Sequence, residues 1–299
     1  MFNLKLMDLE TVKKNFLGVK NIPMKKADVV IVPFGLEKTT TFGKGTSKGP
    51  QRIIEVSPNL EYFDEELERD VCKEVKISTL EEPKIKNNHE KAIAQLEKIT
   101  DEIYKLGKFP LVLGGEHSLT LGSIRSALKK FPNLNILQFD AHADLRDEYE
   151  GTIYNHASVM RQCLKFNGLN LVQVGVRNIS TDTNEFGFWQ ENQTRIKTFW
   201  AKDMADWKVK DVVDSLSKNV YLTFDLDAFD SGLMPATGTP EPGGLNWYQT
   251  TEILRAVASK KKIIGADVVE LTPIKGFNAP DFLAAKLVYK IIGYQSLMS

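Results

Sequence analysis

The chain has 299 residues, of which 42% are hydrophobic, enough to bury the core of one large α/β domain. Its 39 basic residues balance its 39 acidic residues, so the net charge predicts neither a nucleic-acid-binding protein nor an acidic tail. We therefore expect residues 1–299 to form one domain with a small-molecule partner.

The cysteines and the N-terminal segment favour a cytoplasmic protein. Cys72 and Cys163 are far apart and belong to no CxxC unit, so they predict neither a disulfide framework nor a zinc ribbon. Charges interrupt the apolar residues of segment 1–16, which argues against a signal peptide. No apolar run approaches the roughly 18 residues of a membrane span. We expect a soluble, unprocessed protein without a membrane partner.

The first half of the chain alternates between strand and helix patterns. Residues 27–35 form an apolar, β-branched run closed by Pro and Gly, which predicts a buried strand. Segment 37–50 is rich in Gly, Thr and Ser and predicts a long loop, a kind of segment that is often functional. Apolar residues from Ile93 to Leu106 recur at three- and four-residue steps and predict a helix that ends at Gly107.

The same alternation continues toward the C-terminus and predicts an α/β fold. Helix patterns precede apolar strand patterns at 109–115, 135–140, 219–225 and 262–270. Repeated units of this kind predict a mainly parallel central sheet with helices on both faces. Segment 177–205 follows neither period, so no element is predicted there.

Acidic and imidazole side chains gather where four of these strands end. The motifs are GGEHS, FDAHAD, FDLDAFD and VVELTP, in that order along the chain. In open parallel sheets, ligands bind beyond the carboxyl ends of the strands. We therefore expect the four clusters to converge on one edge of the sheet.

The donor groups in three of these motifs predict a site for two divalent cations. In DAHAD two carboxylates and an imidazole alternate, so an extended segment would place all three on one side, and FDLD repeats the spacing. With the histidine of GGEHS the set exceeds what one ion needs, and its mixed donors favour manganese over structural zinc. The candidate ligands are His117, Asp140, His142, Asp144, Asp225 and Asp227.

A structural role is the alternative for each of these residues. An isolated Asp at a strand end is often a helix cap or a turn residue. Three donors within five residues, however, would repel one another without a cation to neutralise them. Of the four histidines, His117 and His142 lie in the motifs and His156 follows shortly after. His89 falls in a charged stretch, and we expect it at the surface.

Taken together in this order, the motifs resemble the arginase and agmatinase family of ureohydrolases, from about Val29 to Leu287. The most specific matches are DAHAD at 140–144 and FDLDAFDSGLMPATGTPEPGG at 224–244. The resemblance implies a three-layer α/β/α fold, two Mn²⁺ per subunit and a homo-oligomer, either a trimer or a hexamer.

The resemblance also implies a role for each candidate residue. His156 would shuttle a proton, Glu270 would grip the guanidinium, and Asp144 would orient the attacking hydroxide and pass its proton to the leaving amine. One manganese would be held by His117, Asp140, Asp144 and Asp225, and the other by Asp140, His142, Asp225 and Asp227.

The implied reaction hydrolyses a guanidino compound to urea and an amine, with agmatine giving putrescine for polyamine biosynthesis as the expected case. Arg146 stands where arginases carry an Asn that helps to bind the substrate's α-carboxylate, which argues against arginine. The acids of loop 147–150 would attract a distal ammonium. Glu116 in place of the commoner Asp, and Ser231 in place of a usual Pro, remove no predicted ligand.

Several alternatives remain open. N1-aminopropylagmatine, guanidinobutyrate or arginine would require the same chemistry with a different tail in the pocket. A zinc deacylase of related fold usually carries a His-His pair, and the chain has no adjacent histidines. A non-catalytic metal-binding scaffold is the third class, because a fold alone does not secure activity.

Overall fold

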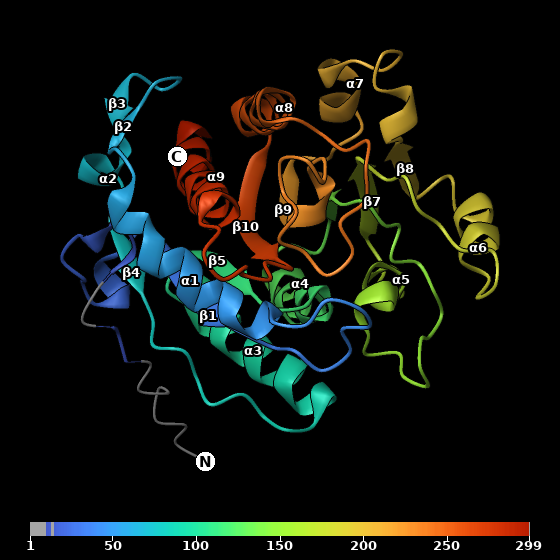
Figure 1. Ribbon diagram of the computed structural model, residues 1–299, viewed down its shortest axis with the longest axis horizontal. Coiled ribbons are helices and arrows are strands. Elements are labelled where there is room, and N and C mark those ends of the chain that lie inside the picture. Colours follow the sequence, from blue (N-terminus) through green and yellow to red (C-terminus); the bar gives the residue numbers. More distant parts are fainter. Residues whose placement is uncertain (1–9, 13–14, 299) are drawn as a thin grey trace.

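In the computed structural model, which describes residues 10–12 and 15–298, eight parallel strands form one central sheet (Figure 1). Their order is β4-β1-β5-β10-β9-β6-β7-β8. The strands are β1 (Val29–Phe34), β4 (Ile77–Thr79), β5 (Phe109–Gly114), β6 (Leu134–Phe139), β7 (Leu169–Val174), β8 (Ile196–Phe199), β9 (Asn219–Asp225) and β10 (Lys262–Val269).

Helices cover both faces of the sheet, which confirms the predicted three-layer α/β/α fold (Figure 1). None of the described helices has the length and apolar character that a bilayer span requires. One layer contains α1 (Gly49–Val56), α7 (Val209–Asp214), α8 (Trp247–Lys260) and α9 (Ala279–Gln295). The other layer contains α3 (His89–Lys105), α4 (Thr120–Lys130) and α5 (Val159–Leu164).

The central strands are mostly apolar because both of their faces are buried. On β1, Val29 and Ile31 pack into the core that contains α1 and α9, whereas Val30 and Val32 pack against α3. Such two-sided burial suppresses the polar alternation of a half-exposed strand. The strand predicted at 27–35 is confirmed, and the four later strands lie where the apolar runs placed them.

The long helix α3 starts earlier than its apolar stripe indicated. The side chain of Asn88 caps it by accepting a hydrogen bond from the backbone N–H of Lys91 at 2.9 Å. Gly107 follows its last turn with a φ of 73°, a conformation that glycine adopts at low cost. The predicted C-terminal boundary is therefore confirmed, and the charged stretch before Ile93 supplies the first turn.

Smaller elements lie outside these layers. The antiparallel pair β2 (Phe63–Asp64) and β3 (Arg69–Asp70) sits beside the short helix α2 (Val71–Glu74), away from the main sheet (Figure 1).

Segment 177–205, for which no element was predicted, contains α6 (Glu185–Glu191) and the edge strand β8. Most of segment 1–16, where no signal peptide was expected, lies outside the described residues.

The four strands that carry the acidic motifs are consecutive neighbours at the centre of the sheet. Their order is β5-β10-β9-β6, and all run in the same direction. Their carboxyl ends therefore meet on one edge, as expected. The four motifs can meet although they are far apart in the sequence. Helices return the chain to the opposite edge of the sheet, so each parallel strand ends at this same edge.

A stacked pair of aromatic rings supports this edge from within the core. Phe139 on β6 and Phe224 on β9 are fully buried, with ring centroids 4.9 Å apart and planes inclined by 18°. Each ring directly precedes an aspartate of the site, Asp140 or Asp225. The stack therefore couples core packing to the position of both carboxylates.

We predict that Phe224→Ala lowers the free energy of unfolding by about 3–5 kcal/mol, because it removes a buried ring and leaves a cavity. Urea denaturation of the full chain measures this change. Phe42→Ala is the control, since that ring is 83% exposed and its loss should change stability by no more than about 0.5 kcal/mol. Equal effects of the two substitutions would contradict the prediction.

Candidate active site

A cavity of about 300 Å³ lies beyond the carboxyl ends of the central strands. Asp140 lies beneath it, fully buried and in contact with His117. The structure thus brings together all eight residues that the sequence singled out. The seven that line the cavity are His117, His142, Asp144, His156, Asp225, Asp227 and Glu270.

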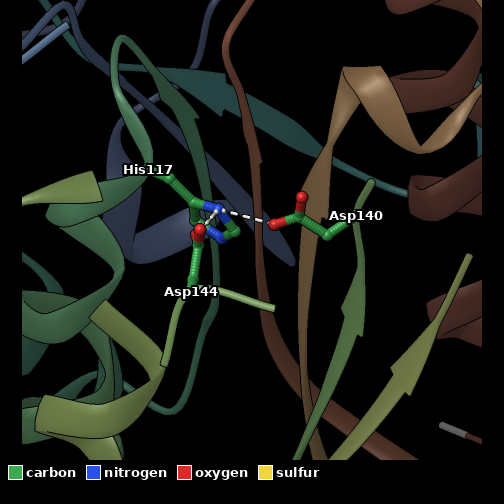
Figure 2. A group of neighbouring side chains, drawn as sticks. All are labelled: His117, Asp140 and Asp144. Carbon is green, nitrogen blue, oxygen red and sulfur yellow. Dashed lines mark ion pairs between the residues drawn. The ribbon is translucent and has the colours of Figure 1, made fainter. Parts of the chain in front are cut away.

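His117 is the centre of a first group of donors. It begins a 3-10 turn after β5 and is almost fully buried. Its Nδ1 lies 3.0 Å from Asp144 Oδ2, 3.1 Å from Asp140 Oδ2 and 3.5 Å from Asp225 Oδ2. Figure 2 shows the ring facing the carboxylates of Asp140 and Asp144. One imidazole nitrogen and three carboxylates thus converge on a small volume.

The other nitrogen of His117 joins a buried hydrogen-bond chain. Nε2 lies 2.8 Å from Thr223 Oγ1, and that hydroxyl donates to Asp267 Oδ1 at 2.6 Å. Because the hydroxyl has one proton, it accepts from Nε2–H, and Nδ1 of the neutral ring carries a lone pair. Thr120 and Tyr221 also donate to Asp267, which holds the chain in place.

The Nδ1 lone pair fits a bound cation. Within the described residues, Nδ1 is a buried atom without a hydrogen-bond partner. Its neighbours are carboxylate oxygens, which repel a lone pair unless a positive charge lies between them. A histidine whose second nitrogen donates toward a carboxylate is the usual arrangement of a metal ligand. The donor set therefore suits a divalent metal ion.

The pKa values of these groups reflect the same crowding. Burial by itself lowers the pKa of His117. The contacts with Asp140, Asp144 and Asp225 have the larger effect and raise this pKa well above the ordinary value. Burial and the charge of Asp140 raise the pKa of Asp144 to about 7. Protons thus supply the positive charge when no metal is bound.

A second group of donors shares Asp140 with the first. His142 Nδ1 lies 3.0 Å from Asp227 Oδ2 and 3.6 Å from Asp140 Oδ1. Backbone N–H groups orient both carboxylates: Ala141 donates to Asp227 Oδ1 at 3.0 Å, and His142 donates to Asp140 Oδ1 at 2.6 Å. Among the described residues, two groups of donors could hold a metal: His117, Asp140 and Asp144, and Asp140, His142 and Asp227.

The expected extended geometry of the two motifs is wrong. Asp144 has a φ of 55°, a left-handed conformation, so DAHAD turns after His142 rather than alternating along a strand. Asp225 caps the 3-10 turn Leu226–Ala228, which contains Asp227, and Asp225 Oδ1 accepts from the backbone N–H of Asp227 at 2.9 Å. The side chains converge because the chain bends around a common centre, which hydrophobic patterning does not reveal.

Glu270 directly follows β10 and has another left-handed conformation, with a φ of 68°. Its Oε1 accepts from the backbone N–H of His117 at 2.6 Å, and its own N–H donates to Gly115 O at 2.8 Å. Burial and the charge of Glu116 raise its pKa well above the ordinary value. A cationic ligand in the cavity would relieve this penalty, as a guanidinium-binding carboxylate requires.

His156 begins a 3-10 turn capped by Asn155, whose side chain accepts from the backbone N–H of Ala157. Its Nδ1 lies 3.3 Å from Thr39 Oγ1. Burial lowers the pKa of the imidazole to about 4, so the ring is neutral at pH 7. A neutral imidazole that lines the cavity can accept a proton.

The expectation for His89 is wrong, because this histidine is not a surface residue. It is the first residue of α3, and only 13% of its side chain is exposed. Its Nε2 lies 2.8 Å from Ser118 Oγ and 3.2 Å from Glu116 Oε1. The charged residues around it in the sequence face solvent, but the helix turns this ring inward.

Sequence reasoning missed three residues of segment 177–205 that shape the cavity. Arg177 donates to the carbonyl oxygens of Asp227, Phe229 and Glu241 at 2.7–3.1 Å, tying together the loops after β9. Asn178 pairs with His142 and lines the cavity. Glu185 accepts from the backbone N–H groups of Leu145 and Ser180. No periodic signal marks them, since all three act on irregular backbone.

The fold and the cavity are those of an α/β enzyme with donors for two metal ions. A sequence model of the Arginase family matches residues 27–293. The chain therefore belongs to the arginase family. It is an agmatinase-like ureohydrolase that hydrolyses a guanidino compound to urea and an amine, as the motifs predicted.

Individual relatives agree with this assignment. The chain is 37% identical to an N(1)-aminopropylagmatine ureohydrolase of Synechocystis sp., over 90% of this chain and 89% of that protein. It is 32% identical to an agmatinase of Pyrococcus horikoshii, over 96% and 99% respectively. The solved structure of an agmatine ureohydrolase of Thermoplasma volcanium superimposes with a TM-score of 0.85 at 27% identity, covering 96% of this chain and 95% of that one.

We predict that Thr223→Val lowers the affinity for a divalent metal by about 10–100-fold, because His117 Nε2–H loses the acceptor that orients the ring. Calorimetric titration of EDTA-stripped protein with Mn²⁺ measures the affinity. Thr223→Ser keeps the hydroxyl and should bind within about threefold of the wild type. Unchanged affinity in the valine variant would contradict the role of the hydrogen-bond chain.

The raised pKa of Asp144 predicts how the stability of the metal-free protein depends on pH. Between about pH 4 and about pH 7 the folded state retains a proton that the unfolded state has lost, so the contribution of this group to stability falls as the pH rises. Asp144→Asn removes this titration.

The free energy of unfolding of Asp144→Asn, relative to the wild type, should therefore increase from about pH 5 to about pH 8 in EDTA. Urea denaturation at several pH values measures the difference. A difference that stays constant across this range would show that Asp144 ionises normally.

Proposed function

We propose that this protein hydrolyses agmatine to putrescine and urea with two Mn²⁺ per subunit. The observation that carries the proposal is the buried Nδ1 of His117, a lone pair directed at three carboxylates. A ureohydrolase needs a strong nucleophile because a guanidinium delocalises its charge and is a poor electrophile. Bound divalent cations supply hydroxide at neutral pH by lowering the pKa of water.

Six residues would hold the two cations. Oxygen-rich donors with two imidazoles suit Mn²⁺ better than structural Zn²⁺. Support for shared carboxylates comes from Asp140, which belongs to both donor groups, and from Asp225, which lies near His117 Nδ1. The first cation would be held by His117, Asp140, Asp144 and Asp225, and the second by Asp140, His142, Asp225 and Asp227.

Glu270 would bind and orient the guanidinium. Its carboxylate is buried and has one oxygen engaged by His117 N–H, which fixes its direction. A planar cation paired with this carboxylate through charge-assisted hydrogen bonds would present its central carbon in a defined position. The raised pKa of Glu270 indicates that a cation at this place stabilises the ionised form.

Asp144 and His156 would handle protons. Asp144 Oδ2 lies 3.0 Å from His117 Nδ1, beside the place proposed for the first cation, and we assign it the transfer of a proton to the leaving amine. His156 lines the cavity as a neutral base and would exchange that proton with solvent. Both assignments follow from the positions of these groups in one cavity.

The surroundings of the cavity favour a cationic tail on the substrate. Glu185 and Glu241 line it, and Arg146 is the only Lys or Arg among its described lining residues. The Arg146 guanidinium lies 4.5 Å from the centroid of the Tyr149 ring. Of the acids in loop 147–150, Asp147 pairs with Arg161 instead. Glu185 accepts from two backbone N–H groups and lies 3.9 Å from Arg146 Nε, so we assign attraction of the ammonium chiefly to Glu241.

N1-aminopropylagmatine is the second candidate substrate. The Synechocystis relative that is 37% identical to this chain is named as a ureohydrolase of this compound. Its longer tail has an additional amine, for which the wall of the cavity offers the carboxylate of Glu241. Guanidinobutyrate and arginine would instead bring a carboxylate into acidic surroundings, at a cost in Coulomb energy.

We also propose that residues 1–299 fold as one domain of a cytoplasmic homo-oligomer, a trimer or a hexamer, that contributes putrescine to polyamine biosynthesis. The continuous central sheet supports a single domain. Light scattering of the full chain would measure the oligomeric state.

Urea release from a substrate panel tests the proposed function. Metal-stripped protein with restored Mn²⁺ should release urea from agmatine faster than from N1-aminopropylagmatine, guanidinobutyrate or arginine. His142→Ala removes one ligand and should abolish most of this activity. Glu270→Gln should retain Mn²⁺ but lose activity, because the variant still binds metal and lacks the charge that holds the guanidinium.

Other outcomes discriminate among the alternatives. Faster release from another guanidine would keep the mechanism and replace the substrate. Tight Mn²⁺ binding without urea from any compound would favour a metal-binding scaffold, and deacylation with Zn²⁺ would favour a deacylase.

A further inference from the structure

The carboxylate of Glu116, the residue before His117, makes an unusually large set of contacts. It is fully buried and is surrounded by donor atoms from two other segments and from Ser118. The backbone N–H groups of Lys38 and Thr39 donate to Oε2 at 2.5 and 2.6 Å. Thr39 Oγ1 and Ser118 Oγ donate to Oε1 at 2.8 and 2.5 Å, and His89 Nε2 lies 3.2 Å from the same oxygen.

These contacts attach the loop after β1 to the end of β5. The backbone N–H of Glu116 donates to Leu36 O at 2.7 Å, and its carboxylate holds the next residues of the same loop. Residues 40–43, directly beyond, line the cavity. An Asp at this position is one methylene shorter and would not reach both backbone donors without moving the loop. The length of Glu116 therefore sets where the loop lies.

Thr39 extends this network to His156. Its hydroxyl donates to Glu116 Oε1 at 2.8 Å and lies 3.3 Å from His156 Nδ1. The hydroxyl has one proton and has given it to a carboxylate, so it accepts from His156. The neutral imidazole is then protonated at Nδ1, and Nε2 carries the lone pair.

We propose that Glu116 and Thr39 are positioning residues that hold His156 as its Nδ1–H tautomer, so that Nε2 is the nitrogen that accepts a proton in the cavity. The inference rests on the proposed role of His156 as proton carrier. Without the relay, the ring would populate both tautomers and rotate, and only a fraction of the molecules would present a lone pair to the substrate.

His89 completes the enclosure of this carboxylate. Ser118 gives its proton to Glu116, so His89 Nε2–H is the donor in its 2.8 Å contact with Ser118 Oγ. The ring therefore shields Glu116 from water on the side of α3, and a shielded carboxylate binds the Thr39 hydroxyl more strongly. This accounts for the inward position of a histidine that the sequence placed at the surface.

A matched pair of variants tests the relay in the Mn²⁺-loaded full chain. Thr39→Val removes the hydroxyl but keeps the side-chain shape and the backbone donor to Glu116. We expect kcat for urea release to fall by about 10–100-fold, with KM within about twofold of the wild type. Thr39→Ser keeps the hydroxyl and should retain kcat within about threefold.

Nitrogen NMR reads the tautomer directly and independently of activity. The full chain, labelled with ¹⁵N in its four histidines and mixed with diamagnetic Mg²⁺, should show one protonated Nδ1 for His156, assigned by its loss in His156→Asn. Thr39→Val should shift this signal toward a mixture of tautomers, whereas Thr39→Ser should not. Glu116→Asp provides a second route to the mixture if the valine variant fails to fold.

Three outcomes would overturn the proposal: an Nε2–H tautomer in the wild type, an unchanged tautomer in both Thr39→Val and Glu116→Asp, or equal loss of kcat in the valine and serine variants. Absence of urea from every guanidine in the wild type would instead count against the proposed function, and the NMR result would still decide whether the relay exists.

Discussion

The site depends on the mutual repulsion of carboxylates that the fold buries around His117. Three of them lie within 3.5 Å of its Nδ1, beyond the ends of strands whose residues are mostly apolar and buried. Such a cluster is stable only when positive charge lies among its members. Protons fill that role in the metal-free protein, where the carboxylates raise the pKa of His117, and divalent cations would fill it in the working enzyme.

The rest of the structure holds these groups in a conformation that they would not adopt alone. Asp144 and Glu270 both have left-handed backbone, at a cost of order 1–3 kcal/mol each. Packing of the four central strands and backbone hydrogen bonds to the carboxylates offset this cost. Arg177 adds three hydrogen bonds that join the loops after β9. The strained residues lie where function requires an exact direction rather than a relaxed chain.

Hydrogen bonds with two hydroxyl groups favour opposite tautomers of His117 and His156. Thr223 accepts from Nε2–H of His117 and donates to Asp267, which leaves Nδ1 free for a cation. In the proposed relay, Thr39 accepts from Nδ1–H of His156 and donates to Glu116, which leaves Nε2 free for a proton. In each case a hydroxyl donates its single proton to a buried carboxylate. The hydroxyl can then only accept a hydrogen bond from the imidazole, which favours the tautomer protonated at the contacting nitrogen. In the proposed mechanism, hydrogen bonding thus prepares His117 for the metal and His156 for proton transfer.

The sequence by itself determined the α/β class, the central strands, and the set of donors at their ends, because apolar runs and clustered acids are local properties of the chain. The family followed from the spacing of DAHAD and FDLDAFD. Only the tertiary structure decided how these donors meet: the left-handed turn at Asp144, the inward ring of His89, the bracing by Arg177 and the contacts of Glu116. Each depends on groups far apart in sequence and on irregular backbone, for which hydrophobic periodicity carries no information.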